Sequence, residues 1–264
     1  MVNPVDFFTH SAPLVFAHRG GRALGPENTL AALDIGLEAG ADGLEFDLRL
    51  SRDGVPVVIH DATLDRTTSA TGLVRDHTAA ELARVDAAYH FHSAGQHPWR
   101  GQGVGICTLA EVLRRYPDRR LIVEMKDNLT ELGEAVAAVL RKDSALGRIC
   151  AAGFGSLSVK AVRRALPEVA TSAHMSEVRA ALYGSWVGWR VRGRGYGGYQ
   201  VPEARGGFRV VSPRFVRLAH RAGHKVQVWT VDEADDIARL LAWGVDAIIT
   251  DRPDAARRAV GDPG

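Results

Sequence analysis

Short apolar runs alternate with helical patterns along almost the whole chain. Eight runs have the length and composition of strands: Leu14–Ala17, Gly43–Leu48, Leu121–Met125, Ile149–Phe154, Val169–Ala173, Tyr199–Val201, Val226–Trp229 and Ala247–Thr250. Helical patterns lie between them at Leu30–Ala39, Leu109–Tyr116, Leu132–Arg141, Leu157–Leu166, Ser176–Tyr183, Phe215–Ala222 and Ala234–Ala242. Because the helices separate the strands, the pattern predicts an α/β fold with a closed (β/α)8 TIM barrel rather than an open sheet.

Chain length, net charge and cysteine content limit the class of protein. With 264 residues and no low-complexity linker or repeat, we predict a single domain over residues 1–264. The net charge of +2 argues against a nucleic-acid partner. Cys107 and Cys150 are too far apart for a disulfide framework. We see no secretory signal and no apolar run that could span a bilayer, so we expect a cytoplasmic protein. The oligomeric state stays open.

The second strand is followed by a segment with no room for a helix. Parallel crossovers need about a dozen residues or more, whereas Asp53-Gly54 is typical of a tight hairpin turn. We therefore expect Val57–Ile59 to return antiparallel to the second strand above the barrel rim. That fold brings His60 back level with Glu45 and Asp47.

Two longer segments also interrupt the alternation. Residues 62–107, with a short helical pattern at Ala79–Val85, are predicted to be a small insertion over the barrel mouth. The Trp186–Tyr199 stretch is rich in Gly, aromatic residues and Arg. Because so many glycines disfavour an amphipathic helix, we interpret it as a flexible loop on the ligand side, with membrane contact as the minor alternative.

Carboxylates gather at the carboxyl ends of the predicted strands, where barrel enzymes build their sites. Glu45 and Asp47 are two residues apart on one strand, so their side chains share a side. Glu124 and Lys126 repeat this spacing on the next barrel strand. Oxygen ligands of this kind suit one divalent cation, Mg²⁺ or Ca²⁺, with Mn²⁺ also compatible. Ion pairs at the rim are the alternative, but two pairs on neighbouring strands favour a functional site.

Two histidines are predicted to reach the same mouth. His18 ends the first strand and His60 arrives through the hairpin, so they can serve as general acid and general base near neutral pH. A single histidine after a strand is more often a hydrogen-bonded rim residue. Arg19 can bind a phosphate with two hydrogen bonds, and Lys126 can neutralise one as a point charge.

Further polar and aromatic positions have structural interpretations first. Asn28 or Thr29 is expected to cap the first helix, with ligand contact by Glu27 or Asn28 as an added possibility. Phe154 and Trp229 end two strands, and such residues usually pack in the core, but at a barrel mouth they can hold the carbon part of a substrate. The segment 250–253 is interpreted as structural, tying down the last strand end.

Several ordered motifs resemble the glycerophosphodiester phosphodiesterase family. They are HRGGRALGPENT (18–29), GADGLEFDLRLSRDGVPVVIHDATLDRTT (40–68), ICTLAEVL (106–113), IVEMK (122–126) and VQVWTVDEADDIARLLAWGVDAIITDRPD (226–254). The resemblance covers about residues 14–254 and implies a TIM-barrel enzyme with one divalent cation. It maps catalytic roles to His18 and His60, metal ligands to Glu45, Asp47 and Glu124, phosphate contacts to Arg19 and Lys126, and the aromatic of the substrate site to Trp229.

The expected reaction is metal-dependent hydrolysis of a small glycerophosphodiester to glycerol 3-phosphate and an alcohol. The nucleophile, water or the glycerol 2-hydroxyl, is left open, as are the head group and the division of acid and base roles between the histidines. A lysophospholipase D acting on lysophospholipids is the nearest alternative, and an apolar groove beside the mouth would favour it. A non-catalytic barrel that binds a phosphate ligand is the alternative of a different class.

Overall fold

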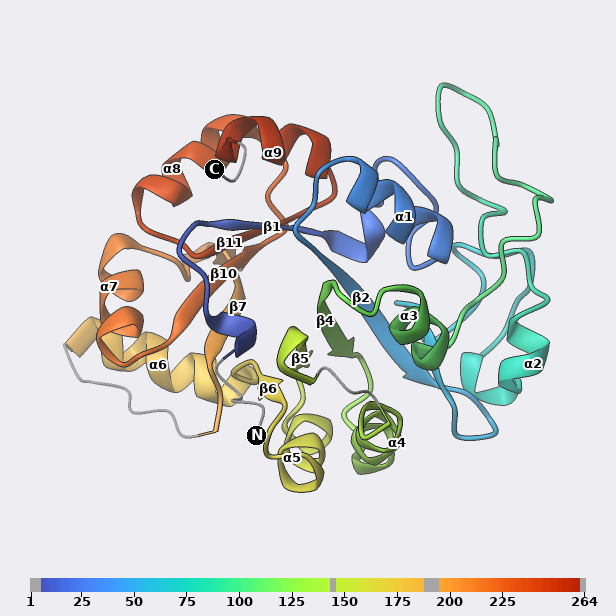
Figure 1. The fold of residues 1–264 in the computed structure, drawn as a ribbon, viewed down its shortest axis with the longest axis horizontal. Coiled ribbons are helices and arrows are strands. Elements are labelled where there is room, and N and C mark those ends of the chain that lie inside the picture. Colours follow the sequence, from blue (N-terminus) through green and yellow to red (C-terminus); the bar gives the residue numbers. More distant parts are fainter. Residues whose placement is uncertain (1–5, 143–145, 188–194, 262–264) are drawn as a thin grey trace.

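Eight parallel strands form a nearly closed barrel in the computed structural model, which describes residues 6–142, 146–187 and 195–261 (Figure 1). They are β1 (Leu14–Ala17), β2 (Gly43–Leu50), β4 (Arg120–Met125), β5 (Ile149–Ala152), β6 (Ala170–Thr171), β7 (Gly198–Pro202), β10 (Lys225–Trp229) and β11 (Ala247–Thr250). Their order is β6-β5-β4-β2-β1-β11-β10-β7. A single parallel bridge from Ser172 to Gly198 joins the outermost strands, β6 and β7. The predicted α/β barrel is therefore confirmed.

Helices surround the barrel on its outside (Figure 1). They are α1 (Leu30–Glu38), α3 (Leu109–Arg115), α4 (Thr130–Leu140), α5 (Ser156–Ala165), α6 (Met175–Val187), α7 (Pro213–Arg221), α8 (Ala234–Ala242) and α9 (Pro253–Val260). Thr29 caps α1 by accepting a hydrogen bond from the Ala32 N–H. The expected end of α6 was wrong: the helix continues through Gly184 and carries Trp186, so Trp186 does not belong to a loop. Residues 188–194 of the predicted loop lie outside the described residues.

The hairpin after β2 forms as the turn signal predicts. Strand β3 (Pro56–Val58) pairs antiparallel with β2, with Leu48 opposite Val58. Gly54 adopts a φ of +74° in the turn, a conformation that glycine reaches without steric cost. The Ile59 N–H then donates to the Asp47 carbonyl at 3.0 Å, which places the next residue, His60, beside the end of β2.

The segment after the hairpin has a small apolar core of its own. It contains a 3₁₀ turn, η3 (Val74–Asp76), and the short helix α2 (Ala79–Leu82). Leu64, Val74 and Leu82 are buried together against Val57 and Ile59 of the hairpin. The segment projects from one side of the barrel next to α1 and α3 (Figure 1). Its description as an insertion over the mouth stays a prediction.

Smaller elements complete the described fold. Three further 3₁₀ turns are η1 (Asp6–Phe8), η2 (His18–Gly20) and η4 (Leu146–Arg148), and β8 (Ala204–Arg205) pairs antiparallel with β9 (Phe208–Arg209). Phe7 and Phe8 of η1 pack with Phe16 and Ile122 in one buried cluster inside the barrel. Two residues further along β4, Ile122 gives way to Glu124 on the same face. The barrel interior thus changes from apolar to acidic toward the carboxyl ends of its strands.

Candidate active site

Three carboxylates converge at the carboxyl ends of β2 and β4. In the parallel register Asp47 lies opposite Glu124, and Glu45 precedes Asp47 on the same face. One ligand atom from each of the three residues lies within 4.8 Å of the other two. The predicted common orientation of the two pairs is therefore what the fold produces.

Two of these carboxylates are held by neighbouring donors. Asp47 Oδ2 accepts a hydrogen bond from Asn28 Nδ2 at 2.9 Å and lies 3.1 Å from Arg19 Nε. Asp47 Oδ1 lies 3.3 Å from Lys126 Nζ, which also donates to Glu124 Oε1 at 2.8 Å. Glu27 and Asn28 thus support the site rather than line its centre: Glu27 accepts from Arg19 Nη1 at 2.8 Å.

Glu45 is only partly satisfied. Its Oε2 accepts a hydrogen bond from the Arg19 N–H at 2.9 Å, whereas its buried Oε1 has no hydrogen-bond partner among the described residues. Burial and the nearby Asp47 charge raise the pKa of Glu45 to about 8, and the same two causes raise the pKa of Glu124. Burial opposes ionisation of Asp47 too, but Lys126 and Arg19 lower its pKa.

An uncompensated oxygen in a buried cluster of three carboxylates is the arrangement that a divalent cation satisfies. The donor set is entirely oxygen, which suits Mg²⁺, Ca²⁺ or Mn²⁺ rather than a soft metal. The residues present therefore fit the expected cofactor class.

Each predicted catalytic histidine is held by a carboxylate. His18 Nδ1 lies 2.6 Å from Asp251 Oδ1, and His60 Nδ1 lies 2.6 Å from Asp61 Oδ1. These contacts leave Nε2 of each ring for the site, and His18 Nε2 lies 3.9 Å from Glu45 Oε2. Burial alone would lower the pKa of His18, but the charge of Glu45 and the bond to Asp251 raise it. Burial lowers the pKa of His60 despite its carboxylate neighbours.

Neither carboxylate partner was identified as functional from the sequence. Asp61 follows His60 directly, so the adjacent pair was a usable signal. Asp251 was interpreted as structural, and its contact with His18 spans 233 residues. Only the pairing of β1 with β11 brings the two together.

A sharp turn after β1 positions Arg19. Arg19 adopts a φ of 51° and Gly20 a φ of 84°, both in the left-handed region. A Cβ at Gly20 would lie 2.6 Å from the backbone carbon of Ala32 in α1, so only glycine fits there. The tight turn directs the Arg19 backbone N–H at Glu45 and its guanidinium at Asp47.

These side chains enclose a cavity of about 240 Å³. It is lined by His18, Arg19, Glu45, His60, Ile122, Glu124, Lys126, Phe154, Gln200, Trp229, Thr230 and Ile249. Of the nine predicted site residues, eight line it, and the ninth, Asp47, is buried among their partners. Gln200, to which the sequence assigned no chemistry, also lines it and donates to Gln227 at 2.8 Å.

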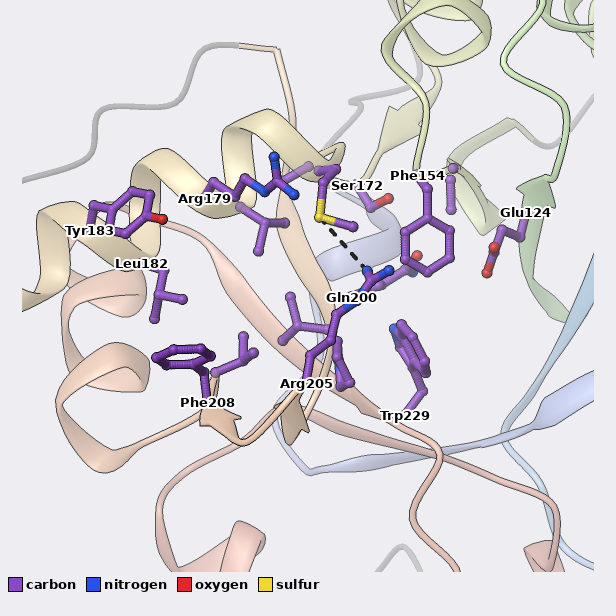
Figure 2. A pocket seen from close by; sticks show the side chains of 18 of the residues that line it. Glu124, Phe154, Ser172, Arg179, Leu182, Tyr183, Gln200, Arg205, Phe208 and Trp229 are labelled. Atoms are coloured by element: carbon purple, nitrogen blue, oxygen red, sulfur yellow. Dashed lines mark hydrogen bonds between the residues drawn. The ribbon is translucent and has the colours of Figure 1, made fainter.

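Phe154 and Trp229 meet at the side of this cavity. Their rings are nearly perpendicular, with centroids 5.7 Å apart. Beyond them lies a second cavity of about 390 Å³, which shares Glu124, Phe154, Gln200 and Trp229 with the first. Figure 2 shows the two rings standing between Glu124 and the more apolar side chains of that second cavity.

Comparisons with known proteins agree on one family. The sequence model of the glycerophosphoryl diester phosphodiesterase family matches residues 18–255. A glycerophosphodiester phosphodiesterase of Caldanaerobacter subterraneus subsp. tengcongensis is 32% identical over 91% of this chain and 95% of its own. A probable glycerophosphodiester phosphodiesterase 2 of Mycobacterium tuberculosis is 33% identical, over 96% and 92%.

Solved structures resemble the barrel closely. The glycerophosphoryl diester phosphodiesterase domain of an uncharacterised Mycobacterium tuberculosis protein superposes with a TM-score of 0.82 at 25% identity, covering 94% of this chain and 99% of that domain. An Oleispira antarctica phosphodiesterase, solved with the product sn-glycerol-3-phosphate, has a TM-score of 0.73 at 27% identity, covering 94% and 97%. Within the described ranges, no helix is long and apolar enough to cross a membrane.

Proposed function

The chain belongs to the glycerophosphoryl diester phosphodiesterase family of hydrolases, and we propose that it hydrolyses glycerophosphodiesters to glycerol 3-phosphate and an alcohol. One observation carries the proposal: two carboxylate-held histidines and a cluster of three carboxylates surround a single cavity. The product complex of the Oleispira antarctica phosphodiesterase supports the same product. Binding alone would not require two oriented histidines.

Glu45, Asp47 and Glu124 would hold one divalent cation, Mg²⁺ or Ca²⁺ with Mn²⁺ also compatible. When bound, such a cation stabilises the negative charge that develops on the phosphoryl oxygens. The Arg19 guanidinium and the Lys126 ammonium line the same cavity and donate to those oxygens. Phe154 and Trp229 pack against the carbon part of the substrate.

The two histidines divide the proton transfers. Asp61 and Asp251 each accept the Nδ1–H of their histidine, so that each ring presents Nε2 to the phosphodiester. One Nε2 removes the proton of the nucleophile, and the other ring protonates the leaving alkoxide. Two nucleophiles fit this arrangement: water, or the glycerol 2-hydroxyl, which forms a cyclic phosphate that water then opens.

The proposal is tested by glycerol 3-phosphate release from glycerophosphocholine and glycerophosphoethanolamine. The protein is first treated with EDTA, and Mg²⁺, Ca²⁺ or Mn²⁺ is then added back. We expect cation-dependent release, and we expect His18→Ala and His60→Ala each to lose most turnover while keeping the circular dichroism of the wild type.

Three results would contradict parts of this proposal. Release that survives EDTA would remove the cation from it, and a histidine variant with near wild-type kcat would remove that residue's role. Tight binding of the diester without turnover in any of the three cations would instead indicate a non-catalytic binding barrel. Following the reaction by ³¹P NMR shows whether a cyclic phosphate forms.

A further inference from the structure

The cavity beyond Phe154 and Trp229 has no role in the reaction proposed above. Its volume of about 390 Å³ exceeds the 240 Å³ of the cavity that holds the histidines. Because both cavities share Glu124, Phe154, Gln200 and Trp229, a group attached to the phosphate can pass from one to the other. A volume of several hundred Å³ is what a drug-sized ligand group occupies.

The second cavity is lined mainly by apolar side chains. One wall is the face of α6 that presents Met175, Val178 and Leu182, spaced three and four residues apart. Val201 and Pro202 of β7 and Val210, which follows β9, also line the cavity. An aliphatic group here would contact apolar side chains from α6 and from these residues.

The charges around this cavity oppose a cationic head group. Lys126 Nζ lies 5.6 Å and the Arg205 guanidinium 5.7 Å from the centre of the Phe154 ring, so both cations already face that ring. Arg179 lines the cavity as well. Among its described lining residues the single carboxylate is Glu124, which belongs to the metal-binding cluster. A quaternary ammonium would therefore meet repulsion, whereas an alkyl chain would not.

Large apolar side chains at the outer end of the cavity remain exposed to water. Phe208 of β9 is 68% exposed, Tyr183 59% and Trp186 53%, and all three line the cavity. Tyr183 and Trp186 pack edge to face with ring centroids 5.3 Å apart. In Figure 2, Tyr183 and Phe208 lie at the end of the pocket far from Glu124. Clustered exposed apolar residues of this kind mark a ligand or partner site.

We propose that the second cavity binds an aliphatic chain of the phosphodiester, so that the enzyme prefers substrates with one acyl or alkyl chain over fully deacylated ones. This inference rests on the proposed function and specifies its substrate class. The bond between phosphorus and the leaving alcohol oxygen breaks, an oxygen of the nucleophile bonds to phosphorus, and the leaving alkoxide takes up a proton. The aliphatic chain can be attached at either of two places in the substrate: as an ester on the glycerol of a lysophospholipid, or as the leaving alcohol.

The test is a chain-length series measured on the wild-type protein with added cation. One arm compares glycerophosphocholine with its butanoyl, hexanoyl and octanoyl lyso-esters, scored by choline release. The other uses butyl, hexyl and octyl esters of glycerol 3-phosphate, scored by glycerol 3-phosphate release. We expect kcat/KM to rise roughly fourfold per added methylene in one arm, which corresponds to ~0.8 kcal/mol per buried methylene.

Variants locate the effect. Val178→Trp fills the cavity from α6 and should abolish the chain-length dependence while leaving turnover of glycerophosphocholine within twofold. Ala180→Trp is the matched control, because Ala180 is exposed on the same helix and does not line the cavity. Phe208→Ser, at an exposed position with little risk to folding, should weaken only the longest chains.

Each other outcome has a defined meaning. Turnover of glycerophosphocholine with a flat chain-length series in both arms, or an unchanged series in Val178→Trp, overturns the inference but not the proposed function. No turnover of any substrate overturns both. A homodimer that Phe208→Ser dissociates, measured by light scattering, would show that a second copy covers the apolar residues and would also overturn it.

Discussion

Glu45→Gln should stabilise the cation-free protein above pH 8 while removing most activity. Burial and Asp47 raise the pKa of Glu45 from the ordinary 4.5 to about 8. A carboxyl with a higher pKa in the folded state binds more protons there than in the unfolded chain. Stability in the absence of cation therefore falls as the pH rises from 4.5 through about 8. At ~1.4 kcal/mol per pH unit this loss has an upper limit of roughly 5 kcal/mol.

The amide removes this loss without removing the contacts of the side chain. The glutamine oxygen can still accept a hydrogen bond from the Arg19 N–H, which lies 2.9 Å from Glu45 Oε2. The amide NH₂ group of the glutamine then takes the place of the unpartnered Glu45 Oε1. The repulsion within the carboxylate cluster also raises the pKa of Glu124, so Glu45 accounts for only part of the loss. We therefore expect the substitution to recover about half of the upper limit in unfolding free energy, which corresponds to a Tm gain of about 5–10 °C for a protein of this size.

Thermal unfolding in EDTA from pH 5 to 9, by circular dichroism, measures the effect. The wild-type Tm should fall with rising pH and that of Glu45→Gln should change less. Adding Mg²⁺, Ca²⁺ or Mn²⁺ should raise the wild-type Tm, since a ligand of the folded state stabilises it, and should raise that of the variant much less. A variant less stable than the wild type at every pH would refute the reasoning and make Glu45 a structural ion-pair residue.

Three further predictions concern the turn and the histidines. Asp251→Asn should lower kcat about 10- to 150-fold, since a hydrogen bond to a charged group contributes ~1.5–3 kcal/mol. It should also shift the limb of the pH–rate profile that reports His18 to lower pH, because Asp251 raises the pKa of His18. Arg22→Gln is the control: it removes an exposed partner of Asp251, and its kcat should stay within twofold of the wild type. Of His18→Ala and His60→Ala, the variant that lacks the general acid should lose far less activity on the p-nitrophenyl ester of glycerol 3-phosphate than on glycerophosphocholine, because p-nitrophenolate leaves without a proton; equal losses in both variants would contradict separate roles. Gly20→Ala should cost about 3 kcal/mol in urea unfolding, given its positive φ and the 2.6 Å approach to α1, and an unchanged midpoint would refute that strain.

Local patterns predicted the parts of the site that depend on neighbouring residues. Glu45 and Asp47 share a face because strand side chains alternate, which a two-residue spacing reveals directly. His60 reaches the same mouth because Asp53-Gly54 forms a tight turn, and that signal also lies within a few residues. The strands were also predicted from local patterns, and the observed strands differ from the predicted ones mostly at their ends.

Contacts between distant segments were not predictable in this way. The hydrogen bond between Asp251 and His18 depends on the closure of the barrel, and no sequence pattern around either residue predicts it. The apolar cavity arises where α6 faces the strand ends and the β8–β9 hairpin, which single-element patterns do not describe. The length of α6 was underestimated because the Gly-rich stretch from Trp186 onward was interpreted as a loop, whereas the helix continues to Val187.

The hydrogen bond between His18 and Asp251 joins the first barrel strand to the end of the last one. One of the two proposed catalytic histidines therefore acquires its orientation only when the ring of strands has closed. Its contact with Asp251 joins residues far apart in the sequence, and forming it carries a large loop-closure cost. During refolding, catalytic activity should return with the last kinetic phase, after most helical signal has recovered. Partial denaturation that separates β1 from β11 should likewise abolish activity before the helices unfold.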